Sequence, residues 1–126
     1  MPLVRIDLRS GKDAAYRDAL GVAVYEALSA IGAPENDRFQ VIAEHDAHGL
    51  VFDRTYLGIE RTDDFVLVQI TFNEGRTLEQ KKALYEGIVE RMKTSVGMRP
   101  EDVFVNLVET RKENWSFGNG IAQYAP

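Results

Sequence analysis

The sequence predicts an α+β fold in which two β-α-β units form a four-stranded mixed sheet with two helices on one face. Three observations support this fold class: strand and helix patterns alternate, the order strand–helix–strand occurs twice, and a nearly constant offset separates the two occurrences. We expect a single domain over residues 1–126, with internal halves at about 2–44 and 65–109 and a C-terminal tail at 110–126.

The first half opens with a strand. Residues 4–8 alternate apolar and charged side chains, which predicts a strand with one buried face. Asp13 is positioned to cap a helix whose apolar stripe continues to about Ile31. A glycine and a proline then end the helix, and residues 39–44 are expected to form the next strand, joined by a right-handed crossover.

The second half follows the same order. Residues 65–72 give the strongest strand pattern in the chain. Thr77 and Gln80 have the spacing of a capping box, which predicts a helix that runs to about Val96. Residues 103–109 complete the unit as the fourth strand.

The two halves have the character of a repeat. Gly11 and Gly75, which follow the first strand of each half, are 64 residues apart. Gly32 and Gly97, which end the helices, are 65 apart. Agreement of turns, caps and helix ends predicts a duplicated unit. Because the strand at 65–72 is apolar on both faces, we expect another subunit to cover its second face.

Composition excludes several functional classes. The formal net charge is −5 with both signs interspersed, which argues against nucleic acid or an anionic membrane as a partner. The chain contains no cysteine, so disulfides and thiol chemistry are excluded. It begins with no signal-peptide pattern and has no apolar run of membrane-spanning length, so we expect a cytoplasmic protein.

Pro2 is the first candidate for chemistry. Methionine before a small residue is normally removed, and removal of Met1 would leave a secondary amine that directly precedes a buried strand. Such an amine acts as a base when neutral and as an acid or electrostatic catalyst when protonated. Burial and a nearby cation would lower its pKa towards neutrality. The alternative interpretation is that Met1-Pro2 is an accidental start.

Two charged residues are candidates for substrate contacts. Arg76 follows the turn at Gly75 and could hold a carboxylate, because helix starts beside strand ends favour anions and arginine binds carboxylates in a bidentate manner. Asp37 could activate water or orient a carbonyl group. Equally, Arg76 could be a solvated loop residue, and Asp37 could shape a turn or pair with Arg38.

The tail is rich in large apolar residues. Trp115 is the only tryptophan, and Phe117 lies two residues further on. These rings could form a wall over a pocket, of this subunit or a neighbour, or could anchor an interface without a chemical role. His45 and His48 have a spacing that metal sites use, but they lie where a strand runs into a loop, and no metal site is predicted.

Together these features resemble the tautomerase superfamily, and within it the malonate semialdehyde decarboxylase group. The resemblance rests on the Met-Pro start, the duplication, the arginine after the second-half strand and the tail motif at 115–118. It implies a homotrimer that uses no metal or organic cofactor. It also implies Pro2 as the catalytic amine, Asp37 as its assistant, Arg76 as the ligand of the substrate carboxylate, and an aromatic wall of Trp115, Phe117 and Tyr124.

One position departs from the decarboxylase pattern, which has two arginines separated by one residue. Glu74 replaces the first of them and would repel an anionic substrate. Either Lys12 or Arg38 compensates, or the substrate is not malonate semialdehyde. We therefore expect an enzyme acting on a small oxo acid or its enol, by keto–enol tautomerisation or by decarboxylation. The alternatives are a non-catalytic ligand-binding or interaction trimer, and an oligomer that the tail merely locks together.

Overall fold

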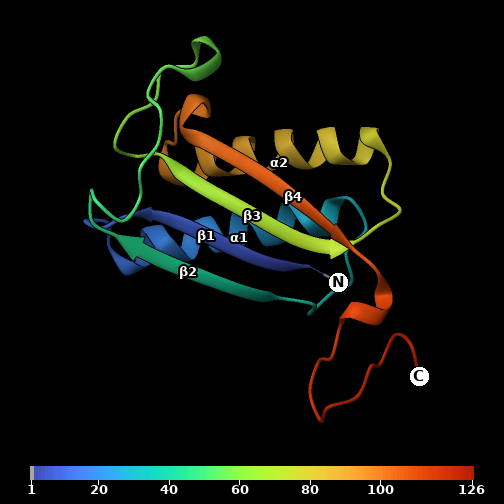
Figure 1. Cartoon of the computed structure of the whole chain (residues 1–126). Coiled ribbons are helices and arrows are strands. Elements are labelled where there is room, and N and C mark those ends of the chain that lie inside the picture. The colour runs from blue at the N-terminus through green and yellow to red at the C-terminus, as the bar shows by residue number, and fades with distance from the viewer. Residues whose placement is uncertain (1) are drawn as a thin grey trace.

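The computed structural model describes residues 2–126 and contains six main elements (Figure 1). In chain order they are β1 (Leu3–Arg9), α1 (Ala14–Ala30), β2 (Phe39–His45), β3 (Val66–Asn73), α2 (Leu78–Val96) and β4 (Val103–Thr110). Each half is thus a strand–helix–strand unit, and every predicted strand and helix is present within one or two residues of its expected bounds.

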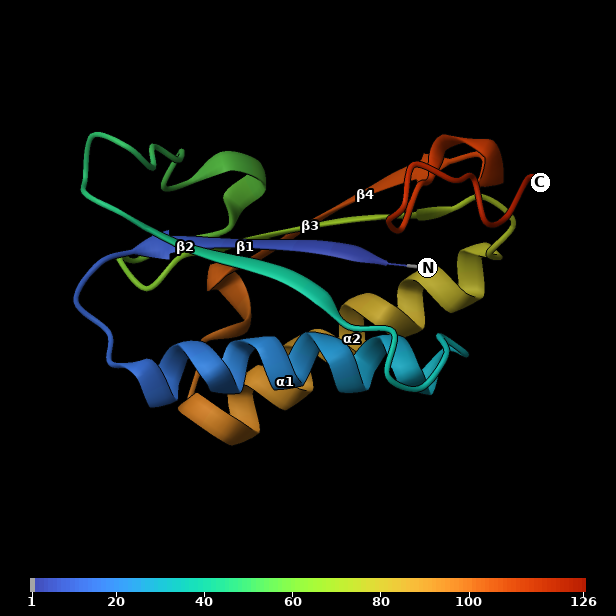
Figure 2. The same cartoon turned by 90° about the horizontal axis from the view of Figure 1, so that it is seen from below.

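The four strands form one mixed sheet in the order β2-β1-β3-β4. Each unit pairs its own two strands in parallel, whereas β1 and β3 pair antiparallel at the centre. Both helices lie on the same face of the sheet (Figure 2). The structure confirms the predicted fold class. The antiparallel centre also places equivalent ends of the two units at opposite ends of the sheet.

Local signals in the sequence account for the helix ends. The Asp13 side chain accepts a hydrogen bond from the Tyr16 backbone N–H at 2.8 Å, and Thr77 and Gln80 form the complete capping box. Gly97 ends α2 in a left-handed conformation with φ of 69°, which glycine adopts without steric strain. No helix within residues 2–126 combines the length and hydropathy that crossing a bilayer requires.

The core lies between the sheet and the two helices. Alternate residues of β1 and β3 point towards the helices, and the apolar stripes of α1 and α2 pack against them. Phe72, near the end of β3, is fully buried, so its truncation to alanine would cost about 3–5 kcal/mol. The fully buried members of this core on β3 and α2 are Val66, Val68, Ile70, Phe72, Leu84, Ile88 and Met92.

The opposite face of the sheet is open in the single chain. It carries several large apolar side chains that are exposed: Leu3, Phe39, Val41, Phe104 and Val108. The loop between β2 and β3 and the C-terminal tail stand at opposite ends of this face, both on the side away from the helices (Figure 2). A hydrogen-bonded cluster of Arg5, Asp7 and His45 crosses it.

Candidate functional site

Pro2 is buried at the entrance to β1. It lines a cavity of about 280 Å³ together with residues from β1, β2 and the tail: Leu3, Phe39, Trp115, Ser116 and Phe117. Because β1 and β3 are antiparallel, the start of β1 lies beside the end of β3, where Arg76 follows. The fold therefore brings the first residues of the chain, the tail and the β3–α2 connection to one end of the sheet. Met1 itself, and its predicted removal, lie outside the described residues.

Asp37 is half-buried in the turn that leads from α1 into β2. Burial raises the pKa of its carboxyl group, whereas the positive charge of Arg76 opposes this rise. Asp37 and Arg76 therefore lie within electrostatic range of each other. A carboxyl group whose pKa is raised by burial in such a cluster is a common feature of functional sites.

Arg76 is half-buried and held in place from two sides. Its Nη1 donates to the backbone carbonyl of Asn73 at 3.2 Å, and its Cζ lies 4.2 Å from the centre of the Phe72 ring. Burial lowers the pKa of the guanidinium, whereas the negative charges of Glu109 and Asp37 oppose this effect. Within residues 2–126 no salt bridge forms on Arg76, so N–H donors remain to bind a carboxylate.

The tail places its aromatic rings beside Pro2. Trp115 and Phe117 stack with ring centres 5.5 Å apart, and both line the cavity. Tyr124 meets the Phe117 ring edge-on at 5.0 Å and does not itself line the cavity. Trp115 Nε1 donates a 2.7 Å hydrogen bond to the Asn73 side chain. The three rings thus lie together, and Tyr124 contacts Phe117 from outside the cavity.

The structure distinguishes between the two cations that could replace the missing arginine. Lys12 lies at the other end of the sheet, where it pairs with Asp64 at 2.8 Å. It cannot compensate for Glu74, because the antiparallel centre separates repeat-equivalent positions. The Arg38 guanidinium packs over the Tyr25 ring of α1 at 5.5 Å and donates to Gln40. Glu74 is exposed, and the positive charge of Arg76 opposes the rise that burial causes in the pKa of Asp37.

Two further residues, which the sequence patterns do not indicate, help to build this site. Asn73 contacts both Arg76 and Trp115, and Lys81 on α2 forms a 2.7 Å ion pair with Glu109. Neither residue stands in a recognisable motif, because each acts on partners that are distant in sequence. The only indication of Asn73 in the sequence is its position, because it is a polar residue that ends an apolar strand.

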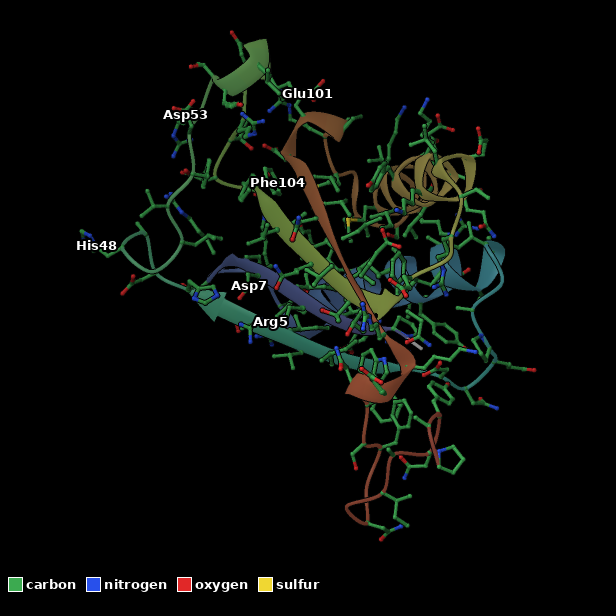
Figure 3. All side chains as sticks on the ribbon, turned by 45° about the vertical axis from the view of Figure 1, so that its right-hand side comes forward. Arg5, Asp7, His48, Asp53, Glu101 and Phe104 are labelled. Atoms are coloured by element: carbon green, nitrogen blue, oxygen red, sulfur yellow. The ribbon has the colours of Figure 1, made fainter. Side chains whose placement is uncertain are left out.

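The two histidines do not share a site. His45 Nε2 lies 2.6 Å from the Asp7 carboxylate on the open sheet face. His48 is exposed and points outward at the edge of the β2–β3 loop, whereas Asp7 lies with Arg5 on β1 (Figure 3). Across residues 2–126 no group of three His, Cys, Asp or Glu side chains is arranged to hold a metal ion.

Comparison with known proteins identifies the family to which this chain belongs. A family model described as tautomerase enzyme matches residues 37–118, and a second model with the same description matches residues 2–58. A probable tautomerase of Bacillus subtilis, YusQ, is 42% identical over 98% of both chains. The chain therefore belongs to the tautomerase family, as the resemblance predicted.

Solved structures agree with this assignment. A malonate semialdehyde decarboxylase with decarboxylase and hydratase activities, solved in wild-type, proline-to-alanine mutant and inactivated forms, is 34% identical with a TM-score of 0.89. The match covers 97% of this chain and 95% of that one. A fused 4-OT protein solved as a symmetric trimer is 26% identical, with a TM-score of 0.77 and 98% of both chains covered.

Proposed function

We propose that this protein is an N-terminal-proline tautomerase that acts on a small oxo acid or its enol. One observation carries the proposal: buried Pro2 lines an apolar cavity at the end of the sheet where Asp37 precedes β2 and Arg76 follows β3. This set supplies an amine, a second acid–base group and an anion anchor, which is the equipment that proton transfer on an oxo acid requires. Removal of Met1 is part of the proposal.

The proposed mechanism assigns one role to each group. Arg76 holds the substrate carboxylate in a bidentate pair. The Pro2 amine accepts the proton of the enol hydroxyl and, as the ammonium, returns a proton to the adjacent carbon to give the keto acid. Asp37, whose pKa is raised by burial, donates or accepts a hydrogen bond at the oxygen where charge develops. Proton numbers balance without any other reactant.

Decarboxylation is the second reaction that these groups could support. Malonate semialdehyde decarboxylase is among the structural relatives, and an apolar wall such as that of Trp115 and Phe117 favours loss of a carboxylate charge. Glu74 weighs against this reaction here, because its charge follows the strand end where a second cation would strengthen anion binding. We therefore rank tautomerisation first.

We also propose that the active protein is a homotrimer. The open sheet face exposes five large apolar side chains on three of its four strands, namely Leu3, Phe39, Val41, Phe104 and Val108, and such a surface is typical of an interface. The fused 4-OT relative is a symmetric trimer. Light scattering on the purified protein tests this, and a monomer at micromolar concentration would contradict it.

Kinetics with two substrates test the function. We expect the natural protein to ketonise phenylpyruvate enol, and Pro2→Ala to lower this turnover by more than about tenfold, the scale of a lost acid–base group. Glu74→Arg should raise the ratio of malonate semialdehyde decarboxylation to tautomerisation. Intact mass must first establish that Met1 is absent. Equal activity of the natural protein and Pro2→Ala would overturn the proposal and favour a non-catalytic binding protein.

A further inference from the structure

We infer that Asn73 is a positioning residue that aligns the aromatic wall with the anion anchor. The inference rests on the proposed function and identifies a group that touches neither the reacting atoms nor the cavity. Asn73 uses two acceptors at once: its Oδ1 accepts from Trp115 Nε1 at 2.7 Å, and its backbone carbonyl accepts from Arg76 at 3.2 Å. One residue therefore sets the relative positions of two groups that are 39 residues apart in sequence.

The position of Asn73 in the sheet makes this dual contact possible. It is the last residue of β3 and pairs with Thr110, the last residue of β4. Phe72, one residue earlier, points into the core and carries the Arg76 guanidinium on its ring. Side chains alternate along a strand, so Asn73 points to the opposite face, towards the tail. A short amide at this point reaches the indole N–H, which is a donor only.

The tail needs such a contact because most of its hydrogen bonds and ring contacts are within the tail itself. Gln123 closes the loop with two hydrogen bonds, accepting from the Phe117 N–H at 2.9 Å and donating to the Gly118 carbonyl at 2.9 Å. Within this loop the Trp115 and Phe117 rings stack, and Tyr124 meets Phe117 edge-on. In the described residues, two side-chain hydrogen bonds join the tail to the strands: the Asn73–Trp115 bond and a 2.7 Å bond between Asn114 and Thr110. Of these, only the first reaches the cavity.

The consequence is a defined distance between anchor and wall. A substrate held by Arg76 meets a Trp115 ring whose position is set from the same strand end, so the length and bulk of the substrate are restricted. Without the Asn73 acceptor, the indole N–H would lose a partially buried hydrogen bond and the wall would move relative to Arg76. Misplacement of a positioning group lowers turnover even when the chemical groups are unchanged.

A double-mutant cycle tests the inference. Asn73→Leu removes the acceptor with similar volume, and Trp115→Phe removes the donor but keeps an aromatic ring. If the two residues act through their shared bond, each variant lowers kcat/KM by about tenfold, and the double variant loses no more than the worse single variant. Asn73→Gln, which retains an amide acceptor, should recover part of the loss. Asn114→Ala removes the neighbouring tail bond and should keep kcat/KM within about twofold.

Fluorescence separates this inference from the proposed function. Because Trp115 is the only tryptophan, its emission reports directly on the wall. We expect a red shift and greater iodide quenching in Asn73→Leu, but not in Asn114→Ala. A natural protein without turnover would overturn the proposed function, whereas emission would still test the contact. Unchanged emission in Asn73→Leu, or multiplicative losses in the double variant, would overturn the positioning role.

Discussion

The two ends of the sheet carry equivalent residues of the repeat, but these residues lie in different environments. At one end lie Asp37 and Arg76, and at the other lie their repeat equivalents, Asp102 and Lys12. Asp102 is fully buried and saturated: it accepts from the Thr62 N–H at 2.7 Å and from its hydroxyl at 2.6 Å. Lys12 is paired with Asp64, and both line a pocket of only about 10 Å³, which is separate from the cavity of about 670 Å³ beside the β2–β3 loop.

The end that holds Pro2 differs in its cavity and in how its cation is held. Its cavity is about 280 Å³, the pKa of Asp37 is raised by burial, and Arg76 is fixed by Phe72 and Asn73 rather than by a carboxylate. The contrast teaches that the same residue types become structural when their hydrogen bonds are satisfied within the chain. They become candidates for chemistry when a cation forms no salt bridge within the described residues, as with Arg76. Four predictions test this contrast.

The largest expected effect is on substrate binding by the two cations. Arg76→Met should lower kcat/KM by about a hundredfold, because a partly buried partner of the substrate carboxylate is lost. Lys12→Met removes only a surface pair and should leave kcat/KM within about twofold. Steady-state kinetics on both variants measure the difference. Similar losses in both variants would remove the distinction between the two ends.

The second effect is on the free energy of unfolding, and it differs between Asp102 and Asp37. Asp102→Asn should lower the free energy of unfolding by about 2–3 kcal/mol, because one buried oxygen that accepts from Thr62 is replaced by a donor. Asp37→Asn should not destabilise the protein at pH 7. Urea unfolding compares the two, and a larger loss in Asp37→Asn would mean that Asp37 is the structural residue.

The third effect is the pH dependence of that comparison. The pKa of Asp37 is raised by burial in the folded protein, so its favourable contribution is present in acid and is lost as pH rises through the folded pKa. Asp37→Asn should therefore be more stable than the natural protein near pH 7, by on the order of 1 kcal/mol, and this advantage should disappear below about pH 4. Urea unfolding across this pH range measures it. A constant difference would show that ionisation of Asp37 is not the cause.

The smallest effect concerns Lys81. Its ion pair with Glu109 keeps that carboxylate engaged beside Arg76. In Lys81→Met the released carboxylate would compete with the substrate for Arg76, and KM should rise about threefold with little change in kcat. Lys82→Met, at the exposed neighbouring position of α2, is the matched control. An equal rise in the control would point to a general loss of positive charge.

Sequence patterns predicted the fold well because their causes are local. Strand alternation, the Asp13 cap, the Thr77–Gln80 capping box and the Gly97 stop each depend on neighbouring residues. Those local patterns do not specify that β1 pairs with β3. This antiparallel pairing is what places Lys12 and Arg76 at opposite ends of the sheet. The sequence alone could not distinguish between the two cations proposed to compensate for Glu74.

The candidate site was predictable in part. Pro2, Asp37, Arg76 and the tail rings were named from residue chemistry and family resemblance, and the fold brings them to one end of the sheet. Asn73 and Lys81 were not named, because their roles depend on partners 42 and 28 residues away, which only the folded chain brings near. The β2–β3 loop also carries an apolar residue, Phe52. It packs on Phe65 at 4.4 Å and shapes a separate cavity of about 670 Å³.

The central claim is that Pro2 provides a titrating amine within this cluster. Nitrogen NMR of protein labelled with ¹⁵N-proline tests it directly, because an amine titrates and the amide nitrogens of the other three prolines do not. We predict one nitrogen signal that moves with pH, with a midpoint that falls in Asp37→Asn because a stabilising negative charge is removed. Four proline signals that all stay constant with pH would show that the Pro2 nitrogen is an amide, and would contradict the mechanism.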